Sequence, residues 1–166
     1  APFLRKVEEL GLPSLIFINR VDFPQSRIAE IVSGLQTWAH AHIVLREVPI
    51  RDGSTITGFV DLVSERAWKC QDGRHSVLIE MPASVKDREA QARAELLESY
   101  ADFDDALMEE LIEDKKPPLA EVFDITARTV QHHDLIACFF GAAEKGWGIT
   151  RLMKSLRHDA PGVAAA

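Results

Sequence analysis

Two polar residues, Asn19 and Asp22, follow a short apolar run and are spaced to contact one planar ligand. The run Leu15–Ile18 is rich in β-branched and aromatic residues and predicts a short buried strand. In open α/β sheets, ligands bind outside the carboxyl ends of the strands, where Asn19 and Asp22 fall. A carboxylate at that edge can accept two hydrogen bonds from adjacent N–H groups, which guanine offers at N1 and N2. Adenine has an acceptor at N1 and lacks the N2 amine, so the pattern favours guanine.

Asn and Asp also end strands for structural reasons, because their side chains form turns and cap helices. A second motif therefore decides between the two interpretations. Gly141-Ala142-Ala143 follows the apolar run Leu135–Phe140. Small residues let a backbone N–H approach a ligand and donate to guanine O6, although they also permit tight packing of a strand on a helix. Taken together, the two motifs favour a guanine site over two unrelated turns.

Composition limits the class of protein. The chain has 166 residues, of which 46% are hydrophobic and 27% charged, and a formal net charge of −7. This charge argues against direct sequence-specific binding of nucleic acid, which needs a basic surface. Cys70 and Cys138 form no disulfide framework, and with no leader-like segment we expect a cytoplasmic location. The run Leu135–Phe140 is too short to span a bilayer, so we expect no membrane contact.

The spacing of apolar residues predicts an α/β order that is interrupted in the middle. Predicted helices cover residues 3–10, 28–38, 85–113, 119–133 and 149–156, and predicted strands cover residues 15–18, 43–50, 59–63, 67–70, 76–80 and 135–140. Ser84 and Asp87 have the spacing of a capping box at the start of the longest helix. Residues 43–80 predict an antiparallel sheet with a hairpin at Asp72-Gly73. We therefore predict an α/β fold, a parallel sheet with an inserted α+β subdomain.

The predicted helix over residues 85–113 has two distinct faces. One face is an apolar stripe of Leu96, Tyr100, Phe103, Leu107 and Leu111. The opposite face carries carboxylates at Glu95, Glu98, Asp102, Asp105 and Glu109. Such a face either keeps the protein soluble or steers a basic partner to it.

As an ordered set, these motifs resemble elongation factor G or an elongation-factor-G-like paralogue. The similarity runs from the middle of that family's GTPase domain, through its inserted G-prime subdomain, to the end of the domain. It rests on Leu15 to Asp22, Val48-Pro49-Ile50, Gly58 to Val63, Asp104 to Glu109, and Phe140 to Lys145 with Gly148. The resemblance implies a partial P-loop GTPase (Rossmann-like) sheet, with GTPase segments at residues 1–41 and 119–166 and the insert at residues 42–118.

The resemblance also implies roles for five residues at the guanine base. Asp22 would pair with N1 and N2, and Asn19 would contact the base and brace the neighbouring loop. Arg20 would cover the face of the base with its stem, and Ala143 would donate its N–H to O6. Arg20 stands where the family usually has Lys, and its planar group stacks differently. Ala142 stands where the family usually has Ser, which removes a hydroxyl that helps to tie the loop.

Partners follow from the same resemblance. The parent protein would hydrolyse GTP to GDP on the ribosome and drive a step such as translocation. In the family, the acidic helix contacts the basic surface of a ribosomal stalk protein, and the matching residues are Glu98, Asp102, Asp105 and Glu109.

The chain lacks the sequence features of a catalytic centre. It contains no G-x-x-x-x-G-K-[ST] and no recognisable D-x-x-G switch. We therefore expect Mg²⁺ and the phosphates to bind residues outside this chain, and expect the chain alone to be inactive, with no catalytic and no metal-binding residues. Two alternatives remain: a protein-interaction module with weak or no nucleotide binding, and a specialised factor of the ribosome-protection type.

Overall fold

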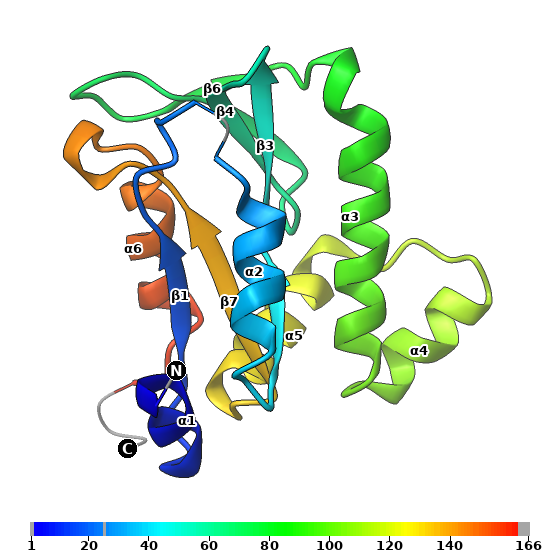
Figure 1. Cartoon of the computed structure of the whole chain (residues 1–166). Helices are drawn as coiled ribbons and strands as arrows, with labels where there is room; N and C mark the ends of the chain where they lie inside the picture. Colours follow the sequence, from blue (N-terminus) through cyan, green and yellow to red (C-terminus); the bar gives the residue numbers. More distant parts are fainter. Residues whose placement is uncertain (1, 25, 163–166) are drawn as a thin grey trace.

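The computed structural model describes residues 2–24 and 26–162, which form two β-sheets with helices packed on them (Figure 1). In chain order the elements are α1 (Pro2–Glu9), β1 (Leu15–Ile18), α2 (Ile28–Gln36), β2 (His42–Leu45), β3 (Glu47–Asp52), β4 (Thr55–Asp61), β5 (Arg66–Lys69), β6 (Val77–Ile79), α3 (Ala83–Ala101), α4 (Asp105–Ile112), α5 (Leu119–Gln131), β7 (Leu135–Phe140), a short 3₁₀ helix (Ala143–Lys145) and α6 (Ile149–His158).

The first sheet is parallel, with strand order β1-β7-β2. All six residues of the central strand β7 are buried, as expected for a strand with neighbours on both edges and helices on both faces. Ile136, Cys138 and Phe140 pack toward the side of α2, while Ala137 and Phe139 pack with residues of α5 and α6. The predicted α/β layers around residues 15–18 and 135–140 are therefore confirmed.

The second sheet is antiparallel, with strand order β3-β4-β5-β6, and α3 packs beside it (Figure 1). The predicted hairpin at Asp72-Gly73 joins β5 to β6, and a second turn at Gly53 joins β3 to β4. Gly73 and Gly53 have φ angles of +65° and +57°, which glycine adopts without strain. Gly58 in β4 is needed for a close approach, because a Cβ there would lie 2.2 Å from the carbonyl oxygen of Trp68. The predicted fold class, an α/β sheet with a separate antiparallel sheet, is confirmed.

The run 43–50, predicted as one strand of the insert, is two strands in different sheets. β2 pairs in parallel with β7, whereas β3 pairs with β4, and Arg46 lies between them. The N–H of Arg46 donates to Cys138 O (3.0 Å) and its carbonyl accepts from the N–H of Leu62 (3.0 Å), so this residue joins the sheets. The chain thus enters the second sheet a few residues after the predicted boundary at residue 42. The division into three segments remains a prediction.

The single long helix predicted over residues 85–113 is wrong. α3 ends at Ala101, and α4 begins after Asp104, whose carboxylate accepts the N–H of Leu107 (3.0 Å) as an N-cap. Asp104 also pairs with Arg128 of α5. Phe103, which was predicted to belong to the buried apolar stripe, lies in this break and is 45% exposed. The capping box at Ser84 is also wrong, because Pro82 is the N-cap of α3.

Within the described residues, no helix is long and apolar enough to cross a membrane.

Candidate functional site

The two motifs predicted to read the base lie side by side, because β1 and β7 are paired and end at the same edge of the sheet. Ile18 is opposite Phe140 in the register. Beyond the strands, the N–H of Gly141 donates to Ile18 O (2.9 Å), and the N–H of Val21 donates to Gly141 O (3.0 Å). These backbone bonds continue the pairing into the loops and fix their relative positions.

Asn19 connects the two loops. Its Oδ1 accepts the backbone N–H of Arg20 (2.8 Å) and the backbone N–H of Ala143 (2.9 Å). Arg20 has a φ of +63°, which turns the chain sharply between Asn19 and Val21. The N–H of Ala143, which the resemblance assigns to guanine O6, thus already has an acceptor. A base would share this donor with Asn19 or take it over.

Asp22 lies on one wall of a pocket of about 400 Å³. The pocket is lined by the five residues predicted to bind guanine, together with Phe23 and Glu144: Asn19, Arg20, Asp22, Phe23, Ala142, Ala143 and Glu144. The side chain of Asp22 is about 20% exposed, and its Oδ2 lies 3.5 Å from Lys145 Nζ. A carboxylate at the wall of an open pocket is positioned to accept hydrogen bonds from a ligand.

Arg20 lies over an aromatic ring of the same loop. Its guanidinium carbon is 4.8 Å from the centre of the Phe23 ring, a cation–π contact. Arg20 and Phe23 thus bring a planar cation and an aromatic ring to the lining of the pocket. The role expected for Arg20, covering the face of a base, stays a prediction.

The loop after β7 closes on itself through its backbone. Ala142 and Trp147 exchange two N–H···O bonds, of 3.1 and 3.0 Å. Gly148, at φ +74°, allows this closure, since a Cβ there would lie 2.5 Å from Phe140 O. These two backbone bonds hold the loop at Ala142, the position at which the resemblance leads us to expect a Ser hydroxyl.

Sequence reasoning missed three residues that the structure places at this site: Phe23, Glu144 and Lys145. Their signal was weak, because none of the three belongs to the two motifs predicted to read the base. Lys145 offered the clearest signal, because it is a cation in the small-residue loop that was predicted to lie near the carboxylate of Asp22.

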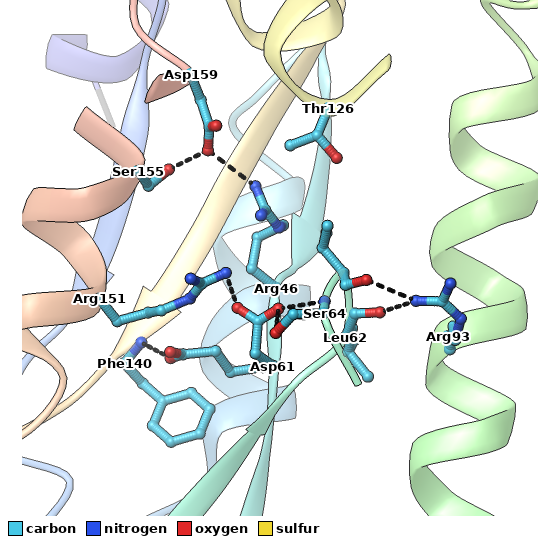
Figure 2. Close-up of polar contacts among 12 residues, drawn as sticks. Arg46, Asp61, Leu62, Ser64, Arg93, Thr126, Phe140, Arg151, Ser155 and Asp159 are labelled. Carbon is cyan, nitrogen blue, oxygen red and sulfur yellow. Dashed lines mark hydrogen bonds and ion pairs between the residues drawn. The ribbon is translucent and has the colours of Figure 1, made fainter. Parts of the chain in front are cut away.

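A network of charged side chains lies around Arg46, where the two sheets meet (Figure 2). Arg46 and Asp159 pair at 3.2 Å with side-chain exposures of 1% and 7%, and Arg151 pairs with the fully buried Asp61. Glu47 Oε2 accepts the N–H of Phe140 at 3.3 Å. Complete burial raises the pKa of Glu47 to about 7. Burial, and next the charge of Arg46, lower the pKa of Arg151 to about 10.

The predicted acidic surface is exposed but is divided between two helices. Glu98 lies on α3, Asp102 is its C-cap, and Asp105 and Glu109 lie on α4. All four side chains face solvent, as predicted.

Comparisons with known proteins give one consistent relationship. No family model matches the chain. An elongation factor G-like protein of Synechocystis sp. is 32% identical over 161 residues, which cover 97% of this chain and 24% of that protein. The chain is related to elongation factor G-like proteins. Elongation factor G 2 of Desulfotalea psychrophila is 25% identical over 160 residues, which cover 95% of this chain and 23% of that protein.

The chain therefore spans about a quarter of the length of these relatives. A crystal structure of the protein ttk003000868 from Thermus thermophilus has the same fold, with a TM-score of 0.78 and 21% identity over 93% of this chain and 23% of that one. The elongation factor G resemblance of the sequence is thus confirmed over nearly the whole chain.

Proposed function

We propose that this chain is the part of a translational GTPase that reads the guanine base and contacts the ribosome. Residues 1–41 and 119–166 belong to the GTPase domain, and residues 42–118 form its inserted G-prime subdomain. The complete protein hydrolyses GTP to GDP and drives a step of translation such as translocation.

The observation that carries this proposal is the bond between Asn19 and Ala143. It joins residues 124 positions apart in the sequence at 2.9 Å, beside the carboxylate of Asp22. Asp22 supplies two acceptor oxygens for N1–H and N2–H, and Ala143 supplies an N–H that O6 would share with Asn19 or take over. Adenine has an acceptor at N1 and an amine donor at position 6, the reverse of guanine, and lacks the N2 amine, so it leaves these groups unpaired.

The rest of the nucleotide binds elsewhere in the complete protein. Among residues 2–24 and 26–162, no group of three His, Cys, Asp or Glu side chains is arranged to hold a metal ion. Mg²⁺ and the phosphates of GTP or GDP are held by residues outside this chain, because P-loop GTPases bind them with a P-loop and switch residues that this sequence lacks. The chain alone then binds GDP very weakly and hydrolyses no GTP.

The insert supplies the ribosome contact. Glu98, Asp102, Asp105 and Glu109 are exposed carboxylates on two helices that meet at Asp104. Their negative field steers a basic surface of a stalk protein to the insert. A cytoplasmic location goes with this partner.

Isothermal titration calorimetry of the complete protein with GDP and ADP tests the proposal. GDP should bind at least about 100-fold more tightly than ADP, since a mismatched base leaves polar groups of the site unpaired. Asp22→Ala should remove most of this preference. Asp52→Ala, at an exposed hairpin turn, is the control and should keep it. Equal binding of GDP and ADP by the wild-type protein would contradict the proposal.

A further inference from the structure

The insert touches the proposed guanine loop directly, through the loop that joins β5 to β6. The N–H of Gly73 donates to the carbonyl oxygen of Lys145 at 3.0 Å. A second contact joins His75 Nδ1 and Thr150 Oγ1 at 3.0 Å. The β5–β6 loop is therefore attached on both sides of the turn that contains Gly146 and Gly148.

Lys145 lies between two carboxylates that belong to different parts of the chain. Its Nζ is 3.5 Å from Asp22 Oδ2 and 3.9 Å from Asp72 Oδ2. The ammonium also lies 4.7 Å from the centre of the Trp147 ring. Asp22 follows β1, whereas Asp72 is at the tip of the β5–β6 loop, so Lys145 bridges the base-reading carboxylate and the insert.

We propose that the β5–β6 loop holds Lys145 against Asp22, so that Lys145 is a positioning residue for the guanine base and the insert sets base selectivity. This inference rests on the proposed function, because it assigns to Lys145 a role at the same site.

The geometry leaves room for both partners of Asp22. An ionised carboxylate has two oxygens with about four acceptor positions. Guanine N1–H and N2–H need one position on each oxygen, so Oδ2 can accept from the base and still face Lys145. The ammonium then restrains the rotation of the carboxylate, which keeps both oxygens in the plane of the base.

The loop that carries Ala143 is held by one hydrogen bond near each of its ends. Asn19 fixes one end through the N–H of Ala143, and the β5–β6 loop fixes the other through the carbonyl of Lys145. The turn needs glycine at position 146, where φ is +77°. A movement of the insert would therefore shift Lys145 and the loop together.

The test compares the binding of GDP and inosine 5′-diphosphate to the complete protein. Inosine lacks the N2 amine, so the ratio of the two affinities reports how well Asp22 is aligned with the base. Lys145→Met keeps the stem over Trp147 and removes the charge, and should lower the ratio about two- to fivefold, the range expected for one partly exposed ion pair. Asp72→Lys should act in the same direction by repelling Lys145. Lys145→Arg should retain most of the ratio.

Asp52→Lys is the matched control, because it reverses an exposed carboxylate at a different hairpin turn of the same sheet, between β3 and β4. It should leave the ratio unchanged. An unchanged ratio in Lys145→Met would overturn the role of Lys145 while leaving the guanine site intact. Equal effects of Asp72→Lys and Asp52→Lys would overturn the role of the β5–β6 loop. A wild-type protein that binds the two nucleotides equally would show that Asp22 does not read the N2 amine and would overturn this inference, whereas the guanine site itself is tested by the comparison of GDP with ADP.

Discussion

Glu47 Oε2 lies 3.3 Å from the backbone nitrogen of Phe140 and accepts its N–H. Glu47 begins β3 in the antiparallel sheet, whereas Phe140 ends β7, one residue before the loop of the candidate site. This contact adds to the backbone bonds of Arg46 and links the insert to the strand that positions Ala143.

The burial of Glu47 predicts a pH-dependent stability. The pKa of Glu47 is raised from 4.5 to about 7 in the folded protein, so the folded state keeps a proton that the unfolded chain releases between these values. Stability contributed by this group is therefore present below pH 4.5 and lost as pH rises through 7. Relative to Glu47→Gln, the wild type should lose about 2 kcal/mol of unfolding free energy between pH 5 and 8. Urea denaturation at both pH values measures this; a difference independent of pH would contradict it.

The buried pair of Arg46 and Asp159 predicts a large effect of removing one partner. Asp159→Ala leaves a guanidinium that is 1% exposed without its carboxylate, and should lower the unfolding free energy by about 3 kcal/mol. Replacing both, in Arg46→Met with Asp159→Leu, should recover most of this loss. Glu9→Ala breaks the exposed pair with Lys6 and should cost less than about 1 kcal/mol. Equal losses in Asp159→Ala and Glu9→Ala, by urea denaturation, would show that the buried pair has no special weight.

The acidic surface predicts a salt-dependent interaction. Reversal of Glu98, Asp102 and Glu109 to Lys in the complete protein should lower the association rate with ribosomes about tenfold at low salt and flatten its salt dependence. Folding should change little because the three side chains are exposed. Stopped-flow binding or ribosome-stimulated GTP turnover measures the effect, and reversal of Glu9, Glu30 and Asp52 gives a control with the same change in net charge. Equal rates for both triple variants would leave the acidic face with a solubilising role alone.

Local patterns predicted most elements, because the apolar runs and turn residues act over short distances. Residues 15–18 and 135–140 were recognisable as strands from their apolar side chains, and Gly73 as a turn from its backbone freedom. The break after Ala101 was missed because the spacing of Leu96, Tyr100, Phe103 and Leu107 continues through it. The N-cap at Asp104 carried the signal, which an apolar stripe alone does not contain.

Partners far apart in the sequence were not predictable from local patterns. The run 43–50 reads as one strand, since the alternation of side chains does not say with which strand each half pairs. Arg46, Glu47 and Asp61 are charged residue types that are usually exposed. Their partners, Asp159, Phe140 and Arg151, come about 90 to 110 residues later in the chain. Lys145 was missed at the site because its carboxylate partners, Asp22 and Asp72, lie far from it in the sequence.

The nucleotide preference of Asp22→Asn tests the central claim most directly. Xanthine carries O2 where guanine has the N2 amine, so an amide at position 22 can donate to xanthine where the carboxylate accepts from guanine. In the complete protein, Asp22→Asn should weaken GTP and favour xanthosine 5′-triphosphate, changing the ratio of the two affinities by about 100-fold or more. Competition titrations of both nucleotides against one fluorescent analogue measure this ratio. If Asp22→Asn binds both nucleotides with wild-type affinities, Asp22 does not read the base and this chain is not the guanine-recognising part of a GTPase.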